Sequence, residues 1–387
     1  MSKPKIRFKG YEEDWEQRKF KNIASRESTT QTSSSEFPSV EYEDVLSEEG
    51  RLNKNIYLKK SEKMGIVFDG SQVLYGKLRP YLHNWLNPDF KGVAVGDWWV
   101  LKPIDTNKDF LYRLIQTQQF DNIANLSSGS KMPRADWNLV VGTEFMIPGS
   151  NKEQQKIGVY FSSLDHLITL HQRKCEETKK LKKYMLQKMF PQNGKRVPEI
   201  RFVGFTDDWE QRKLGDIFKE YSEKKHSELP ALTIIQGKGT IKREESDRNL
   251  MYDKSKLDGY KMVRKNDFIV HLRSFEGGLE KASSDGIISP AYHTFHGENI
   301  DSRFYYPYFR SYEFIKRKLI AHVYGIRDGR SIDISGMKTI KIPYTSYMEQ
   351  VKIGDYLDQL DNLITLHQRK YEELQKIKKF MLQNMFI

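Results

Sequence analysis

An internal repeat constrains this chain more than any other feature of its sequence. Residues Asp14–Lys19 read DWEQRK, and the same six letters return at Asp208–Lys213. The flanks take part as well, because Arg7–Phe20 and Arg201–Leu214 agree at nine of fourteen positions. A match over this length indicates that one structural plan occurs twice in the chain.

A second, longer repeat follows at nearly the same distance. Glu153–Phe190 returns as Glu349–Phe386, with about two-thirds of the positions identical. Between the repeated pieces lie two variable segments, 20–152 and 214–348, which have almost equal length and share little sequence. We therefore expect two copies of a fixed frame, each of which holds a different globular domain.

Composition limits the class of protein. Charged residues make up 30% of the 387 residues and hydrophobic residues 38%, which is typical of a soluble protein. No apolar run approaches the roughly 18 residues of a membrane span, and the basic first ten residues precede no apolar stretch, so we expect no secretory signal. Cys175 is the single cysteine, which excludes an internal disulfide and favours a reducing, cytoplasmic setting.

The net charge of +12 permits nucleic-acid binding without establishing it. The charge is uneven, because the first variable segment is neutral overall whereas the second variable segment and the first long repeat are basic. Solvated surface lysines give many proteins a similar excess. Location of the basic residues therefore matters more than their number.

Both long repeats show the 3-4 spacing of apolar residues that is typical of a helix packed along another helix. A helix of about 40 residues is on the order of 60 Å long. Two such helices separated by a whole domain pair most simply antiparallel, with one domain at each end. The predicted seam consists of Ile157, Tyr160, Leu164, Leu167, His171, Thr178, Leu181 and Met185 in the first helix and of Ile353, Tyr356, Leu360, Leu363, His367, Leu374, Ile377 and Met381 in the second.

A second apolar set widens each stripe beyond one seam, namely Ile168 with Cys175 and Ile364 with Tyr371. These residues could cover the neighbouring domains or dock another protein, and the sequence leaves both possibilities open. His171 and His367 occupy equivalent seam positions, where a polar residue can set the register.

Each long helix also carries a start signal. Ser150–Glu153 and Ser346–Glu349 fit the S-x-x-E capping box, in which serine and glutamate satisfy each other's free backbone amides. Pro191 and Gly194 end the first helix. We therefore expect two helices of nearly equal length.

The variable segments have an α+β pattern. Short strands are expected in Gly65–Tyr75 and Phe268–Leu272, and a helix over Tyr305–His322. Aligning the two copies places KLRPY (Lys77–Tyr81) on HLRSF (His271–Phe275), which indicates one fold with two different surfaces.

Basic and aromatic residues alternate at these strand ends, a pattern that suits contact with phosphates and base edges. Ordinary packing, with the leucine inside and the arginine paired to a carboxylate, would look much the same. A later loop in each segment, Ser127–Trp137 and Tyr324–Asp333, is rich in glycine, serine and arginine. The DNA-binding candidates are Lys77, Arg79, Tyr81, Ser130, Lys131, Arg134, His271, Arg273, Arg327, Arg330 and Ser331.

Signals of catalysis are poor, and we expect no catalytic residue and no metal site. No G-x-x-x-x-G-K-[ST] phosphate loop occurs. NPDF (Asn87–Phe90) is one residue short of the N-P-P-[FY] motif of amino-methyltransferases, and the E-x-K that a nuclease would need, Glu177–Lys179, lies on the predicted helix. The pair His293 and His296 has no third ligand nearby in sequence.

Taken together, DWEQRK, VLYGKLRPYL (Val73–Leu82) and the helix motif EQxKIGxxxxxLDxLITLHQRK (Glu153–Lys174) resemble the specificity (S) subunit of type I restriction-modification systems. The resemblance covers essentially the whole chain. It implies two target recognition domains, 1–150 and 195–346, joined by two long antiparallel coiled-coil helices, 151–194 and 347–387, in a pseudo-two-fold α+β architecture.

The resemblance also implies a division of labour. Each recognition domain would read one half of a split, gapped double-stranded DNA sequence, and the helices would fix the spacer and dock two methyltransferase subunits. Restriction subunits would add the ATP-dependent nuclease. Adenine-N6 methylation and cleavage, with their S-adenosylmethionine, ATP and Mg, would belong to these partners. The helix residues expected to pair or dock are Ile157, Leu164, Leu167, Ile168, Leu181, Ile353, Leu360, Leu363, Ile364 and Ile377.

Two alternatives come from other classes. A self-contained DNA methyltransferase or nuclease would bind S-adenosylmethionine or cut DNA alone, and the missing motifs argue against it. A coiled-coil scaffold that reads no DNA would still bind partners, but changes at Arg79 or Arg273 would leave the choice of target untouched.

Overall fold

The computed structural model describes residues 3–59, 62–126, 132–192, 195–246, 254–271, 278–325 and 331–387. The chain divides into two compact units. The first contains Met1–Arg173 and Gln368–Ile387, and the second contains Lys174–His367. Each unit therefore holds one variable segment, the first half of one long helix and the second half of the other.

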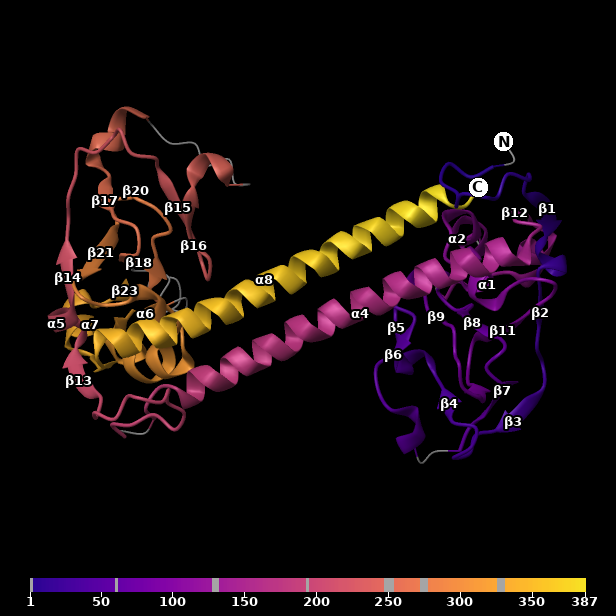
Figure 1. The fold of residues 1–387 in the computed structure, drawn as a ribbon, viewed down its shortest axis with the longest axis horizontal. Helices are drawn as coiled ribbons and strands as arrows, with labels where there is room; N and C mark the ends of the chain where they lie inside the picture. The colour runs from indigo at the N-terminus through magenta and orange to yellow at the C-terminus, as the bar shows by residue number, and fades with distance from the viewer. Residues whose placement is uncertain are drawn as a thin grey trace. The chain divides into compact units, whose positions relative to one another are not determined.

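The first unit contains two four-stranded sheets (Figure 1). Side chains of both sheets, among them Phe68, Leu74 and Trp98, share one hydrophobic core, and a larger aromatic core lies between the second sheet and the helices. The strands pair antiparallel except β4 and β10, which are parallel. One sheet has the order β3 (Thr30–Thr32), β7 (Met64–Phe68), β10 (Gly92–Ala94), β4 (Ser39–Val40), and the other β2 (Ala24–Arg26), β11 (Trp98–Pro103), β8 (Val73–Gly76), β9 (Trp85–Leu86). A small pair, β5 (Val45–Leu46) with β6 (Arg51–Leu52), and the helices α1 (Lys108–Leu114), α2 (Gln118–Ala124) and α3 (Trp137–Gly142) complete the domain.

The second unit repeats the central part of this skeleton. Its four-stranded sheet has the order β14 (Phe218–Tyr221), β21 (Tyr292–Gly297), β18 (Phe268–His271), β19 (Glu280–Lys281), which matches β2-β11-β8-β9 of the first unit. Three two-stranded sheets pair β15 (Leu232–Ile235) with β16 (Gly239–Lys242), β17 (Lys261–Val263) with β20 (Gly286–Ile288), and β22 (Val323–Tyr324) with β23 (Ser331–Ile332). Short helices α5 (Leu214–Ile217), α6 (Ser302–Phe309) and α7 (Ile334–Thr339) pack around them.

The helix predicted over Tyr305–His322 is broken in the structure. α6 ends at Phe309, and a π-helical turn (Glu313–Lys318) and a 3-10 turn (Leu319–His322) follow. The Ser311 hydroxyl accepts a bond from the Phe314 amide (3.2 Å), so a new helical segment begins there. The apolar spacing continues across the break because Phe314 and Ile315 still pack into the same core, which is why the pattern did not show it.

The two long helices are α4 (Asn151–Lys188) and α8 (Tyr347–Asn384), and they run antiparallel within each unit. In the first unit Lys378 on α8 bonds to Asp165 on α4 (2.7 Å). In the second unit the repeat-related pair, Lys182 on α4 and Asp361 on α8, bonds at 2.5 and 2.6 Å. The prediction of two antiparallel helices is therefore confirmed.

The predicted seam is wrong at four of its sixteen positions, two in each helix, and the other twelve are buried or half-buried. Leu167, Leu181, Leu363 and Ile377 are exposed, at 40%, 44%, 44% and 37%. The second apolar set faces inward instead, because Cys175 is 3% exposed and its Sγ lies 3.8 Å from the Ile364 carbonyl oxygen. The stripe is wide enough that residues three and four positions apart are both apolar, so periodicity alone did not choose between them. The inward-facing residues that the predicted seam did not contain include Phe161, Ile168, Cys175 and Lys182 in α4 and Leu357, Ile364, Tyr371 and Lys378 in α8, with Met189 and Met385 just after the two helices.

Candidate nucleic-acid interface

The repeated DWEQRK segment fastens the start of each long helix. In the first copy it forms β1 (Glu16–Lys19), which pairs antiparallel with β12 (Glu144–Ile147), the strand that leads into α4. Arg7 donates from Nε and Nη2 to the two carboxylate oxygens of Glu153 (2.7 and 2.8 Å), and the Trp15 indole N–H donates to the same group (3.4 Å). Glu153 is 2% exposed, so this is a buried, hydrogen-bonded ion pair.

The second copy repeats this clamp with the same residue types. β13 (Glu210–Lys213) pairs with β24 (Lys341–Tyr344), and Arg201 donates to both oxygens of Glu349 at 2.7 and 2.8 Å. The Trp209 indole N–H adds a bond of 3.0 Å. Each glutamate therefore binds an arginine and a tryptophan, and the capping-box prediction is wrong in assigning its carboxylate to the serine amide.

The ends of the long helices complete the cores of the domains. Phe386, after α8, packs among Phe110 (5.4 Å between ring centroids), Trp15 (6.2 Å) and Phe161 of the first unit. Phe190, after α4, packs in the same way against Phe304 (4.8 Å) and others in the second unit. Each domain is thus closed by a residue from the helix that follows the other domain.

On this frame, the first domain carries a polar patch made from two segments distant in sequence. Lys77–Tyr81 leaves the end of β8, and the 132–136 segment lies beside it, because Leu78 and Arg134 form an isolated β-bridge. The Arg79 amide donates to the Pro133 carbonyl (2.7 Å), and the Ala135 amide donates to the Lys77 carbonyl (2.8 Å). The structure thus joins the two loops that the sequence singled out separately.

Asp97, which sequence reasoning missed, lies at the centre of this patch. It accepts two bonds from Arg134, at Oδ1 from Nε (3.2 Å) and at Oδ2 from Nη2 (3.0 Å). Lys77 approaches the same carboxylate at 3.5 Å. The hydrogen bonds from Arg134 hold the pKa of Asp97 below its usual value, so the group is ionised at neutral pH. We refer to Lys77, Arg79, Asp97 and Arg134 as the Asp97 patch.

The remaining candidates of the first domain are placed as follows. Arg79 is exposed in the left-handed conformation (φ 50°, ψ 63°) and pairs with no carboxylate in the part of the chain that the structure describes. Tyr81 is 53% exposed beside it. Ser130 and Lys131 lie outside the described residues. The packed alternative, in which the arginine at this strand end pairs with a carboxylate, therefore does not hold for Arg79.

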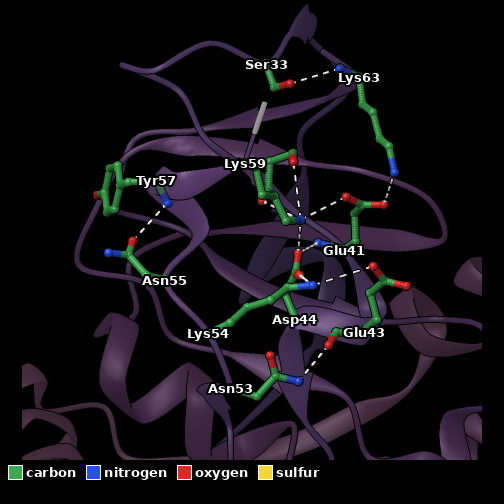
Figure 2. A network of polar contacts seen from close by, with 11 residues as sticks. Ser33, Glu41, Glu43, Asp44, Asn53, Lys54, Asn55, Tyr57, Lys59 and Lys63 are labelled. Carbon is green, nitrogen blue, oxygen red and sulfur yellow. Dashed lines mark hydrogen bonds and ion pairs between the residues drawn. The ribbon is translucent and has the colours of Figure 1, made fainter. Parts of the chain in front are cut away.

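A second charged cluster of the first domain lies in residues 41–63, which sequence reasoning also missed. Figure 2 shows the Lys59 ammonium between the carboxylates of Asp44 and Glu41, with Lys63 on the other oxygen of Glu41. The Asp44 side chain is fully buried and also binds Lys54 (2.8 Å). This network fixes a short turn that exposes Tyr57 (56%) and Leu58 (76%). The alternation of basic and aromatic residues here is the signal that could have found it.

The second domain presents different groups at the equivalent place. The His271 ring packs on Tyr292 with 4.9 Å between ring centroids, and the strand register places Tyr292 opposite His271, as Asp97 lies opposite Lys77 in the first domain. Ser331 is half-buried in β23, opposite Tyr324. Arg273, Arg327 and Arg330 lie outside the described residues. The two domains thus share strands but not strand-end chemistry.

His293 and His296, the pair that the sequence singled out as possible metal ligands, do not share a site in the structure. His293 and His296 bind separate carboxylates, Glu220 and Asp267, each at 2.6 Å. No group of three or more potential metal ligands occurs among the residues that the structure describes. None of the described helices is long and apolar enough to cross a membrane.

Comparison with known proteins agrees with this architecture. Residues 12–180 and 206–376 match the type I restriction modification DNA specificity domain, one match per repeat. The specificity subunit of type I restriction enzyme MjaVIII from Methanocaldococcus jannaschii is 24% identical over 352 residues, which is 84% of this chain and 78% of that protein. The putative MjaX specificity subunit of the same organism is 26% identical over 241 residues, or 59% of this chain and 55% of that protein.

Among solved structures, the S subunit of a type I restriction-modification system from M. genitalium has the same fold. It superposes with a TM-score of 0.64 and 14% sequence identity, and the match covers 100% of this chain and 99% of that one. Two specificity domains in tandem, each with its own clamp and long helix, are what the repeat predicted. The chain belongs to the family of type I restriction-modification DNA specificity subunits.

Proposed function

We propose that this chain recognises a bipartite, gapped double-stranded DNA target and directs partner subunits to it. The observation that carries the proposal is the contrast between an identical clamp and different strand ends. Glu153 and Glu349 each bind an arginine and a tryptophan, whereas Asp97 lies opposite Lys77 in the first domain and Tyr292 lies opposite His271 in the second. One frame with two surfaces fits a split target whose halves differ in sequence.

The chain itself supplies recognition, and the chemistry belongs to the partners. Two methyltransferase subunits would transfer methyl groups from S-adenosylmethionine to adenine N6, and restriction subunits would use ATP and Mg to cut DNA. A cytoplasmic location, where such partners and DNA meet, is part of the proposal. A self-contained enzyme is not favoured, because the family that the chain matches is a DNA specificity domain.

The exposed faces of the long helices support docking of the methyltransferases. Leu167 and Leu181 on α4 and their counterparts Leu363 and Ile377 on α8 are large apolar residues left in solvent. Tyr184 (49%) and its counterpart, Phe380 (55%), extend these faces. Two equal partners need two equal surfaces, and the repeat provides them. We expect Leu167→Asp or Leu363→Asp to weaken binding of one methyltransferase roughly tenfold or more, measured by the mass of the complex in solution.

The test of the whole proposal is a domain exchange. Adenine methylation would be mapped in cells that carry this chain with its methyltransferase, and in cells where residues 20–152 are replaced by another recognition domain. A split motif of which only one half changes supports the proposal. If methylation does not depend on this chain, the proposal is refuted and the alternative of a scaffold that reads no DNA is favoured.

A further inference from the structure

We infer that Arg134 reads a guanine in the half-site bound by the first domain, and that Asp97 is the residue that positions it. The inference rests on the proposed DNA-reading function and adds to it one base and the two side chains that would recognise it. Its basis is the geometry of the Asp97 patch.

The carboxylate of Asp97 starts from a fixed backbone. Gly96 turns the chain with a positive φ of 97°, and Trp98 on the other side is 1% exposed. The Asp97 carbonyl accepts bonds from the Lys77 amide (2.9 Å) and from the Tyr42 hydroxyl (2.7 Å). Tyr42 in turn accepts a bond from the Leu78 amide (2.9 Å). The anchor of the patch is therefore held from two directions.

Arg134 is held at both of its ends. Its backbone is bridged to Leu78, and its guanidinium binds Asp97 through Nε and Nη2. The side chain is nevertheless 51% exposed. Because Asp97 takes the Nε edge of the planar guanidinium, the edge formed by Nη1 and Nη2 is left for a ligand. A planar donor pair in one fixed orientation costs little entropy when it binds a matching acceptor pair.

A guanine base fits this edge better than a phosphate does. Guanine presents two acceptors, N7 and O6, side by side in the major groove, and a bidentate arginine is their commonest partner. A backbone phosphate needs only positive charge, and a carboxylate beside it would weaken the contact by repulsion. The ionised Asp97 at this place therefore favours base reading. The exposed Arg79 lies beside it, pairs with no carboxylate among the described residues, and is therefore better suited to a phosphate contact.

In the described part of the second domain, Tyr292 rather than a carboxylate lies opposite His271, where the first domain has Asp97 opposite Lys77. The His271 ring packs on Tyr292 there instead. We therefore expect the effect of the pair to be confined to the half-site of the first domain, at a single base pair.

The experiment uses the chain assembled with its methyltransferase subunits and measures Kd on a set of duplexes. The set contains the target, versions with each base pair of the first half-site replaced, and an unrelated duplex. The variants are Asp97→Asn, which removes the anchor charge, and Arg134→Lys, which keeps the positive charge but loses the planar fork. The control is Glu210→Gln, which removes one carboxylate from the exposed Arg212–Glu210 pair and so changes the net charge by the same amount as Asp97→Asn.

We expect the native chain to discriminate one G·C pair by roughly 5- to 150-fold. Asp97→Asn and Arg134→Lys should each reduce that discrimination at least fivefold at this position alone, while binding of the unrelated duplex is not weakened. Glu210→Gln should leave discrimination at every position intact. This pattern separates a positioning role from a merely structural one, because a damaged fold weakens binding at all positions.

Other outcomes would overturn the inference. Equal weakening on every duplex by both variants would make Arg134 a phosphate contact, and unchanged discrimination would remove the pair from base reading. If the native complex discriminates no base of the first half-site, the proposed function itself fails, which is distinguishable because the native chain alone shows it.

Discussion

The two units share the contacts that fasten each domain to its long helix, and they differ in the side chains at the ends of their central strands. The clamps, Arg7–Glu153 and Arg201–Glu349, have the same two distances, and both cores are closed by a phenylalanine at the end of the opposite helix. The strand ends, by contrast, carry an anchored arginine in one domain and a histidine on a tyrosine in the other. The contacts that fasten the domains to the helices are therefore the same in both units, and the side chains at the strand ends are what differs.

The helices show a smaller asymmetry of the same kind. Asp165 in the first unit joins two cations, Lys378 (2.7 Å) and Arg113 (2.6 Å), and Arg113 is 2% exposed. Its counterpart in the second unit, Asp361, binds Lys182 and is 49% exposed. Burial lowers the pKa of Lys378. The ion pair between the helices is therefore repeated, but only in the first unit does its aspartate also bind a buried arginine of the globular domain.

The clamp gives the largest expected effect. Glu153→Ala should destabilise the first unit, and Glu349→Ala the second, by about 3–5 kcal/mol each, because either change leaves a largely buried arginine without its carboxylate. Hydrogen exchange measured separately over the two units checks this. Glu176→Ala, an exposed position on α4, is the control. If one substitution lowered hydrogen-exchange protection in both units, the conclusion that each clamp stabilises only its own unit would be wrong.

The closing phenylalanines come next. Phe386→Ala should cost the first unit about 3 kcal/mol and Phe190→Ala the second unit a similar amount, because each removes a ring from a packed aromatic cluster. Denaturant unfolding with the same unit-resolved readout measures both. Ile387→Ala, one residue further on and 39% exposed, should change little. If Phe386→Ala lowered the stability of the second unit instead, the assignment of the chain end to the first core would be wrong.

The helix ion pairs sharpen the comparison because their effects should be unequal. Asp165→Asn should cost about 2 kcal/mol, since it leaves Arg113 and Lys378 without their shared carboxylate. Asp361→Asn should cost less than about 1 kcal/mol, as expected for an exposed pair. Thermal unfolding of the two variants side by side gives the difference. Equal losses would show that burial of Arg113 does not set the energy.

The smallest expected effect is the loss of stability of the Asp44 cluster at low pH. Burial tends to raise the pKa of Asp44, but hydrogen bonds from Lys54 and Lys59 outweigh it and hold the pKa below the usual 3.8. A lowered pKa in the folded state adds stability that is present above the unfolded value and is lost as pH falls through the folded one. Hydrogen-exchange protection of residues 41–59 should therefore be steady from pH 7 to 5 and fall below about pH 4. Asp44→Asn should remove about 1 kcal/mol at neutral pH and flatten this dependence.

Sequence reasoning found the repeat, the antiparallel helices and the pairing of two domains, but it misplaced four of the sixteen seam residues. Leu167 and Ile168 are adjacent apolar residues that point about 100° apart around the helix, and only the packing of Cys175 against Ile364 in the second unit shows which side is covered. The capping box is present only in part: the Ser346 hydroxyl accepts a bond from the Glu349 amide (3.4 Å), but the two glutamate carboxylates bind elsewhere for a related reason. Glu153 has the right spacing for a local bond, but Arg7, remote in sequence, is a stronger partner.

For the candidate interface, composition pointed to the two loops but not to their relation. Lys77, Arg79 and Arg134 were candidates because basic residues at strand ends suit DNA, whereas Asp97 had no such signal. An acidic residue in a DNA-reading surface makes sense only when the arginine that it holds is known. That arginine is 37 residues away in the sequence.

The sequence by itself determined that this chain is one plan written twice, because identical letters at a fixed distance require identical local structure. It also determined the length and direction of the helices, since 3-4 periodicity and start signals are local properties. Only the tertiary structure shows which contacts the repeated residues make. Three contacts in particular join residues that are distant in the chain: β1 pairs with β12, Arg7 binds Glu153, and Asp97 binds Arg134. Such contacts depend on where the folded backbone brings side chains together, which no local pattern encodes.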